Sequence, residues 1–276
     1  MNRPATADPA TIEIAPFTQD HIPQAQILSL AEGWPHRVED WQLTLSVSNG
    51  VVALDRGRVV ATALCSLHGP VATLNMIIVA SEMRGRGLGR QVMERVIALA
   101  GNREMRLVAT DAGVPLYRKL GFVESGRIVQ LHGEPRVASP VRPVEIGPVE
   151  PPRLAGMDRA ASGMEREALL SRIAGIGETL STEGGFALLR PFGRGHVLGP
   201  VVARDAVGAR SLIAEGARRM DGRYLRIDVP EEMGLVPFVE GLGLSVAGGG
   251  VSMVRAPRPR EASEYRTHAL ISQALG

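Results

Sequence analysis

The segment Arg84–Gly89 reads Arg-Gly-Arg-Gly-Leu-Gly and stands just before a helical hydropathy pattern. Its glycines let backbone N–H groups approach a ligand closely, and a helix N-terminus adds unpaired donors and a partial positive charge. Arginine side chains add charge-assisted hydrogen bonds to phosphate oxygens. The segment therefore predicts an anion site, although a glycine-rich turn with two solvated arginines has the same composition.

Two familiar phosphate loops do not fit this segment. The dinucleotide fingerprint Gly-x-Gly-x-x-Gly needs glycine or alanine where this chain has Val92, and it follows the first strand of its fold, whereas Arg84–Gly89 follows several. The P-loop is excluded because no Gly-Lys-Ser/Thr follows the glycines. The segment alone leaves the kind of phosphate ligand open.

The surrounding pattern places the loop between a strand at Val71–Val79 and an amphipathic helix at Leu88–Ala100. Shorter patterns complete an element order of strand, two helices, three strands, helix, strand, helix and strands. They are strands at Thr11–Pro16, Val51–Asp55, Val59–Ser66, Met105–Ala109, Phe122–Glu124 and Arg127–Leu131, and helices at Gln19–Leu30, Val38–Val47 and Val114–Leu120. This order predicts an α/β (α+β) domain with a mixed, mostly antiparallel sheet flanked by helices.

A second unit follows a proline- and valine-rich linker at Pro140–Pro152. It has a similar order of elements, and Val236–Leu244 (Val-Pro-Phe-Val-Glu-Gly-Leu-Gly-Leu) echoes Val114–Phe122 (Val-Pro-Leu-Tyr-Arg-Lys-Leu-Gly-Phe). We therefore predict an internal duplication with domains at residues 1–140 and 141–276. The amphipathic tail Glu264–Leu275 is expected to form a helix that docks on one of the domains.

Composition narrows the class of protein. The 276 residues are 45% hydrophobic with a formal net charge of +2, which supports a folded core and gives no sign of a nucleic-acid partner. Cys65 is the only cysteine, so no internal disulfide and no cysteine-based metal site is expected. The start of the chain lacks the apolar core of a signal peptide and the apolar runs are strand-length. We expect a cytoplasmic protein with no membrane partner and no metal, either a monomer or a homodimer.

Two motifs in register resemble the GNAT superfamily of N-acetyltransferases. The acetyl-CoA signature of that family, Arg/Gln-x-x-Gly-x-Gly/Ala, is met by Arg84–Gly89. A second signature, a small residue followed by Leu-Tyr-x-x-Leu-Gly-Phe, is similar to Val114–Phe122. The resemblance covers about residues 11–132, with the spacing and order of elements that the family has.

The resemblance implies acetyl-CoA as cosubstrate and assigns roles to individual residues. The strand before the loop would splay from its neighbour and pair with the pantetheine arm through its main chain. Tyr117 matches the tyrosine that donates a proton to the departing thiolate. The implied cofactor-binding residues are Ile77, Ile78, Val79, Arg84, Gly85, Arg86, Gly87, Leu88, Gly89, Arg90 and Thr110.

The acceptor pocket of the family lies in the segment between the first two helices, which here contains Trp34, His36, Glu39 and Asp40. Such a cluster could bind and deprotonate an amine. The same residues also fit an ordinary helix start, with Pro35 in the first turn and acids placed for the helix dipole. Asp111 and Glu124 are further acids near the expected thioester end, so the general base stays open.

The second unit resembles a degenerate GNAT domain. Val239 stands where the first unit has Tyr117, and Asp205 stands where phosphate would bind, so we expect this aspartate to cap the helix instead. We expect one cofactor per chain, bound by the first unit. The favoured function is acetyl transfer to a small-molecule primary amine; a protein or peptide N-acetyltransferase and a non-catalytic acyl-CoA sensor are the alternatives.

Overall fold

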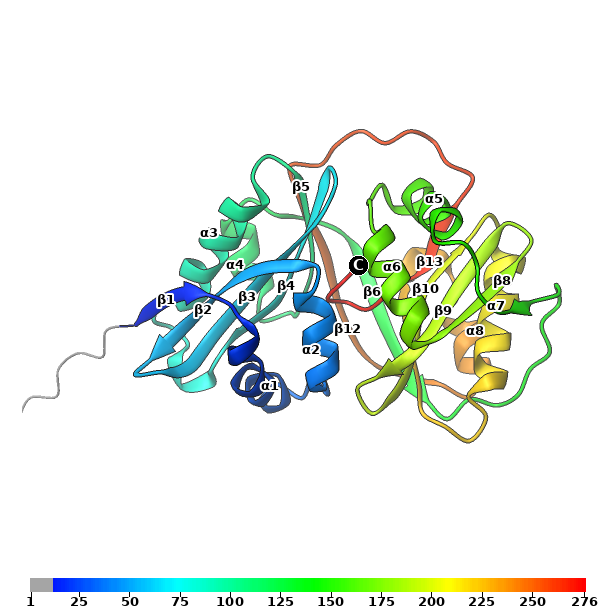
Figure 1. The fold of residues 1–276 in the computed structure, drawn as a ribbon, viewed down its shortest axis with the longest axis horizontal. Coiled ribbons are helices and arrows are strands. Elements are labelled where there is room, and N and C mark those ends of the chain that lie inside the picture. Colours follow the sequence, from blue (N-terminus) through cyan, green and yellow to red (C-terminus); the bar gives the residue numbers. More distant parts are fainter. Residues whose placement is uncertain (1–11) are drawn as a thin grey trace, which may run out of the picture.

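The computed structural model describes residues 12–276, and its strands form one continuous 13-stranded sheet through both halves of the chain (Figure 1). The order along the sheet is β1-β2-β3-β4-β5-β12-β6-β11-β10-β9-β8-β7, with β13 paired to β10. The strands are β1 (Glu13–Pro16), β2 (Ser48–Asp55), β3 (Arg58–His68), β4 (Val71–Val79), β5 (Glu104–Ala109), β6 (Val123–Gly133), β7 (Glu145–Ile146), β8 (Glu178–Thr182), β9 (Gly185–Phe192), β10 (Gly195–Ala203), β11 (Leu225–Pro230), β12 (Ser245–Arg255) and β13 (Arg266–Ala269). The sheet is mixed and mostly antiparallel, which confirms the predicted class.

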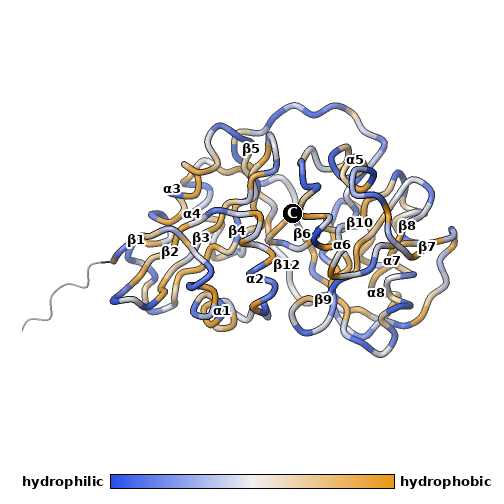
Figure 2. The backbone as a smooth tube through the Cα atoms, in the orientation of Figure 1, coloured by the Kyte–Doolittle hydropathy of each residue, from blue (hydrophilic) through white to orange (hydrophobic). Residues whose placement is uncertain are grey.

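Helices flank this sheet in both halves (Figure 1). The α-helices are α1 (Ile22–Ala31), α2 (Val38–Leu45), α3 (Leu88–Ala100), α4 (Val114–Lys119), α5 (Pro151–Ser162), α6 (Glu167–Ile176), α7 (Ala206–Arg219) and α8 (Val236–Gly241). Three short 3₁₀ turns lie at η1 (Gln19–His21), η2 (Ser81–Met83) and η3 (Glu231–Met233). The main apolar cluster of each half lies between the sheet and one long helix, α3 in the first half and α7 in the second. Figure 2 shows this burial as hydrophobic strands inside more hydrophilic loops.

Two strands are exchanged between the halves. β6 follows α4 in the first half, but its second part, from Ile128 to Gly133, pairs with β11, where Ile128 lies opposite Pro230 and Gly133 opposite Leu225. β12 follows α8 in the second half but pairs with β5, from Ala109–Val251 to Met105–Arg255. The two exchanged strands also pair with each other, so the sheet crosses from one half to the other without an edge.

β4 and β5 pair only at the start of β4. Their parallel ladder covers Val71, Ala72 and Thr73, whereas β4 continues to Val79. The register against β3 shifts in this region, and Met76 has a φ of 49°, a left-handed conformation that marks a bulge. The outer part of β4 therefore diverges from β5 and, within the described residues 12–276, has no strand partner on that side.

In the second half, β10 and β11 diverge in the same way, but another strand occupies the gap between them. β10 and β11 pair in parallel only at His196 and Val197, and β13 then takes the place beside the outer part of β10, with Ala203 opposite Arg266. Just after β13, the backbone N–H of Leu270 donates to the carbonyl oxygen of Asp228 on β11, at 2.9 Å. The chain itself therefore occupies the gap.

Two local predictions differ from the structure. The tail expected as a helix over Glu264–Leu275 contains strand β13 instead, because its residues find partners on β10. The two short strands expected at residues 122–131 are one long strand, β6.

Candidate active site

The glycine-rich loop leads directly into helix α3, whose N-terminus carries no side-chain cap from the described part of the chain. Gly85 and Gly87 have φ values of 77° and 79°, a conformation that glycine adopts without strain, and Gly87 is the N-cap of α3. Among residues 12–276, no side chain accepts a hydrogen bond from the first turn of this 13-residue helix. The free N–H donors and the positive end of the helix dipole therefore remain available to an anion.

A cavity of about 400 Å³ runs from this loop along the outer part of β4. It brings together ten of the eleven residues predicted to bind the cofactor; Arg86 is the exception and does not line it. The residues it brings together are Ile77, Ile78, Val79, Arg84, Gly85, Gly87, Leu88, Gly89, Arg90 and Thr110. The cavity therefore joins the anion site to the unpaired side of β4.

Arg84 fixes the loop to its neighbours. Its Nε donates to the carbonyl oxygen of Val79 at 3.2 Å, and its Nη2 contacts the carboxylate of Glu32 after α1. Arg90 makes an exposed ion pair with Glu94 one turn along α3. Arg84 and Arg90 both line the cavity, as does Glu32, and each arginine would have to share its guanidinium between its carboxylate partner and a bound anion.

Tyr117 lies at the inner end of this cavity. Its side chain comes from α4, is only 7% exposed and packs edge-on against Phe122 with ring centroids 6.2 Å apart. Burial raises the pKa of the phenol above its ordinary value. The hydroxyl therefore keeps its proton at neutral pH and can donate it to a strong base.

A second cavity, of about 300 Å³, meets the first at Trp34, Ile77, Thr110 and Tyr117, which line both. Its other wall comes from the second half of the chain. That wall consists of Arg226 on β11, Ala247, Gly248 and Gly249 on β12, and Ser272, Gln273 and Ala274 after β13. Two ligands could thus approach one another from opposite sides of the gap beside β4.

Two of the four predicted acceptor residues line this second cavity. Trp34 and His36 lie there, and the His36 ring packs edge-on against Phe192 with centroids 5.4 Å apart. Desolvation, followed by the charge of Arg226, lowers the pKa of His36 to about 4, and its Nδ1 is buried with no hydrogen-bond partner among residues 12–276. The ring is therefore neutral at physiological pH. In this lining only His36, Tyr117 and Arg226 are titratable.

Glu39 and Asp40 lie elsewhere. Glu39 is exposed and lines neither cavity. Asp40 is buried and accepts hydrogen bonds from the backbone and guanidinium of Arg37 and from the backbone N–H of Gly193. Arg190 is 3.5 Å from the same carboxylate. Asp40 thus ties α2 to the second half instead of facing an acceptor, and Asp111 and Glu124 are likewise absent from both linings.

Sequence reasoning missed the wall from the second half. Arg226 makes a bidentate ion pair with the buried carboxylate of Asp228, at 2.8 to 3.1 Å. Gln273 donates to Asp228 and contacts Gln130, both at 3.3 Å. The sequence around Arg226 and Asp228 is typical of a strand. Nothing in that local sequence indicates that β11 would line a cavity beside the first half.

The matching position in the second half is closed in three ways. Asp205 caps α7 by accepting from the N–H of Gly208 at 2.7 Å, as predicted, and Arg142 bonds the same carboxylate at 3.0 Å. β13 fills the gap beside β10. Val239, at the position of Tyr117, is fully buried in the core.

Comparison with known proteins agrees with both halves. Models of the acetyltransferase (GNAT) domain match residues 47–124 and residues 154–266. The chain belongs to the GNAT superfamily. This GNAT protein carries two acetyltransferase (GNAT) domains in tandem.

Its relatives include a Bacillus subtilis protein described as the uncharacterized N-acetyltransferase YitH, 29% identical over 120 residues. That match spans 42% of either chain, less than half the length of the relative. A putative acetyltransferase from Pyrococcus horikoshii has a TM-score of 0.85 at 20% identity, covering 100% of this chain and 99% of its own. A tandem GNAT protein from the clavulanic acid biosynthesis pathway has a TM-score of 0.62 at 14% identity, covering 91% and 100%. At these identities the solved structures show a shared fold.

Within residues 12–276 this GNAT protein has no helix with the length and hydrophobicity that a membrane span requires. The same residues contain no group of three or more His, Cys, Asp or Glu side chains arranged to hold a metal ion.

Proposed function

We propose that the protein transfers the acetyl group of acetyl-CoA to a primary amine of a small molecule. One observation carries this proposal: the cavity that begins at the glycine-rich loop and the cavity between the halves meet at Tyr117. A donor lying along β4 and an acceptor lying between the halves would bring their reactive ends together there.

The first cavity fits the cosubstrate. The uncapped N–H groups of α3 with Arg84 and Arg90 would hold the pyrophosphate. The main chain of Ile77, Ile78 and Val79 has no β5 partner and would pair with the amide groups of the pantetheine arm. The contrast with α7, whose N-terminus is blocked by Asp205, supports one cosubstrate per chain.

When bound, acetyl-CoA would supply the thioester carbon that the amine nitrogen attacks, forming the C–N bond of the amide as the C–S bond breaks. A main-chain N–H of the diverging part of β4 would donate to the oxygen on which negative charge develops. Tyr117 would give its phenolic proton to the departing sulfur and recover one as the amine nitrogen is deprotonated.

The acceptor must be neutral when it attacks, although a free alkylamine has a pKa near about 10. The second cavity favours the neutral form because burial disfavours a charged ammonium group and no carboxylate lines this cavity to stabilise one. His36 is neutral and is the one uncharged nitrogen base there.

A cavity of about 300 Å³ closed by the second half suits a small acceptor better than a peptide or a protein lysine. Acetyl-CoA with a panel of amines, amino sugars, amino acids and peptides, followed by release of free thiol, tests the class of acceptor. Thiol release with peptides alone would favour a protein N-acetyltransferase, and tight acetyl-CoA binding without release from any acceptor would favour a sensor.

The role of Tyr117 is tested by Tyr117→Phe. We expect kcat to fall by a factor of about 10² to 10⁴, the usual contribution of general acid catalysis, with acetyl-CoA affinity by calorimetry nearly unchanged. Tyr224→Phe is the matched control, since Tyr224 hydrogen-bonds to His132 and lines neither cavity. Unchanged turnover in Tyr117→Phe would remove the assignment.

A further inference from the structure

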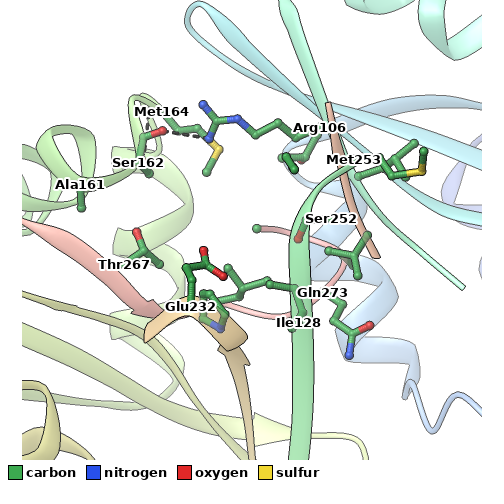
Figure 3. A pocket seen from close by; sticks show the side chains of 18 of the residues that line it. Arg106, Ile128, Ala161, Ser162, Met164, Glu232, Ser252, Met253, Thr267 and Gln273 are labelled. Atoms are coloured by element: carbon green, nitrogen blue, oxygen red, sulfur yellow. Dashed lines mark hydrogen bonds between the residues drawn. The ribbon is translucent and has the colours of Figure 1, made fainter. Parts of the chain in front are cut away.

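A third cavity, of about 340 Å³, lies between the halves beside the proposed acceptor pocket (Figure 3). Its floor is formed by β4, β5, β12 and β6, for example by Thr73, Ser252 and Ile128. Its other walls come from the end of α5 and from the segment after β13, which ends between the two halves (Figure 1). Acetyl transfer as proposed above assigns no role to this cavity.

The lining is basic. Its charged side chains are those of Arg106, Arg166, Arg260, Arg266 and Glu232, and Gly276 also lines it. Arg106 and Arg260 share the carboxylate of Glu104, at 2.6 and 3.5 Å.

The remaining guanidinium groups differ in their partners. Arg166 is neutralised by Asp158 at 2.6 Å, with both side chains fully buried. Arg266 makes no ion pair within residues 12–276. The Nη1 of Arg166 also donates to the carbonyl oxygen of Leu275 and to an oxygen of Gly276, so Arg166 is fully partnered, whereas the two exposed arginines, Arg260 and Arg266, are less constrained.

Buried polar atoms without partners cluster in the same lining. The Nη2 of Arg106 is buried and makes no hydrogen bond to the described residues, while Nη1 donates to the carbonyl oxygen of Ser162 at 2.9 Å (Figure 3). The hydroxyls of Thr73 and Thr267 are also buried and unpartnered. An unpaired buried donor is costly, so three of them around one cavity indicate that a ligand with acceptor oxygens completes the site.

The cavity adjoins the proposed acceptor pocket. Leu74, Val108, Gln273 and Ala274 line both. Gln273 is held at the boundary by its contacts with Gln130 and Asp228. An elongated molecule lying past Gln273 would place one end near Tyr117 and the other among the arginines.

We propose that this third cavity binds the carboxylate of the acceptor, which would make the acceptor an amine that carries a carboxylate several bonds away. This inference rests on the proposed acetyl transfer. The buried, unpartnered Nη2 of Arg106 and the two unpartnered hydroxyls can donate to the two oxygens of a carboxylate, and the planar guanidinium of Arg106 suits carboxylate geometry. A diamine of the same length would bring a second cation to a basic cavity and should be rejected.

The test compares three acceptors of one chain length, 6-aminohexanoate, hexylamine and 1,6-diaminohexane, by kcat/KM for thiol release. We expect the amino acid to be preferred over both amines by about tenfold, the usual worth of one charge-assisted hydrogen bond. Arg266→Ala and Arg260→Ala, at the exposed rim, should reduce this preference, and Arg266→Glu should abolish it. Arg172→Ala is the control, since Arg172 is exposed on α6 and lines none of the three cavities.

Binding of hexanoate by calorimetry gives a second readout that does not depend on turnover. We expect the wild-type protein to bind it and Arg266→Glu to lose it by at least about tenfold. Thiol release with equal kcat/KM for all three acceptors, unchanged in the arginine variants, would overturn the carboxylate site and leave acetyl transfer standing. Hexanoate binding without thiol release from any amine would overturn the proposed function instead.

Discussion

Substitution of Asp40 tests whether its carboxylate stabilises the fold or takes part in catalysis. Asp40 is 3% exposed and accepts from the Nε, Nη2 and backbone nitrogen of Arg37 at 2.9 to 3.1 Å and from the backbone nitrogen of Gly193 at 3.0 Å. Arg190 lies 3.5 Å away and its side chain is 1% exposed. Asp40→Ala would leave Arg190 as a buried charge without its counter-ion.

Breaking a buried ion pair by removing one partner costs about 3–5 kcal/mol. Because the side chain of Arg37 is 35% exposed and can be resolvated, we expect the lower end, about 3 kcal/mol off the free energy of unfolding. Urea denaturation at pH 7 measures it. Glu82→Ala, which removes the partner of Arg58 in an exposed pair, is the matched control and should be neutral within error.

Asp40 should also contribute acid sensitivity. Burial alone would raise the pKa of Asp40, but the hydrogen bonds from Arg37 and Gly193 outweigh it and hold the pKa below its ordinary value. Its contribution to stability is therefore present above the unfolded pKa, near about 4, and is lost as the pH falls through the lower folded pKa. Asp40→Asn should remove that part of the acid transition.

The activity of the folded fraction decides between the roles. If Asp40 ties the halves together, kcat of Asp40→Asn at a temperature where it is folded should stay within about threefold of the wild type, far from the loss of about 10² or more expected for a general base. If the variant had an unchanged free energy of unfolding and a kcat lower by about 10² or more, the structural role would be refuted and Asp40 would have to act in catalysis.

Three further predictions concern single side chains. The folded pKa of His36, about 4, lies below its unfolded value of 6.5, so the unfolded state binds the proton first and stability falls as the pH drops from 6.5 towards 4. His36→Gln should remove at most about 3 kcal/mol of that loss, seen as urea midpoints at pH 5 and 7 that lie closer together than in the wild type; an unchanged gap would argue against the buried neutral ring. Asp205→Ala should cost about 1 kcal/mol of stability through the lost helix cap, yet calorimetry should still count one acetyl-CoA per chain because β13 fills the gap beside β10; two would disprove the closed second site. Gly113→Ala would place a Cβ 2.8 Å from Cε2 of Tyr117 and push the ring aside, so kcat should fall while thermal stability changes little, and normal turnover would show that the ring position is not critical.

The sequence predicted the features that depend on neighbours along the chain. The loop at Arg84–Gly89 forms because glycine dihedrals and a helix start are local properties, and the motif around Tyr117 folds with it. The cap at Asp205 was predictable for the same reason.

The acceptor wall could not be predicted in this way. Arg226 and Gln273 reach the pocket only because β6 and β12 change places, and strand pairing between distant segments leaves no mark in the hydropathy of either. The tail at 264–275 was misread as a helix because its spacing is compatible with one, whereas the open side of β10 decides its conformation. The boundary between residues 140 and 141 stays a prediction, since the sheet runs through both halves.

The exchanged strands determine when during synthesis each part of the sheet can form. The hydrogen-bonding edge of β5 that faces β12 cannot be satisfied until residues 245–255 have left the ribosome. β6 has to wait for β11 as well as β12. Such distant pairings raise the contact order and slow folding, and an open edge can recruit other chains meanwhile. The first half would therefore emerge with an incomplete sheet, and the proposed active site would be completed only after β12 has been synthesised.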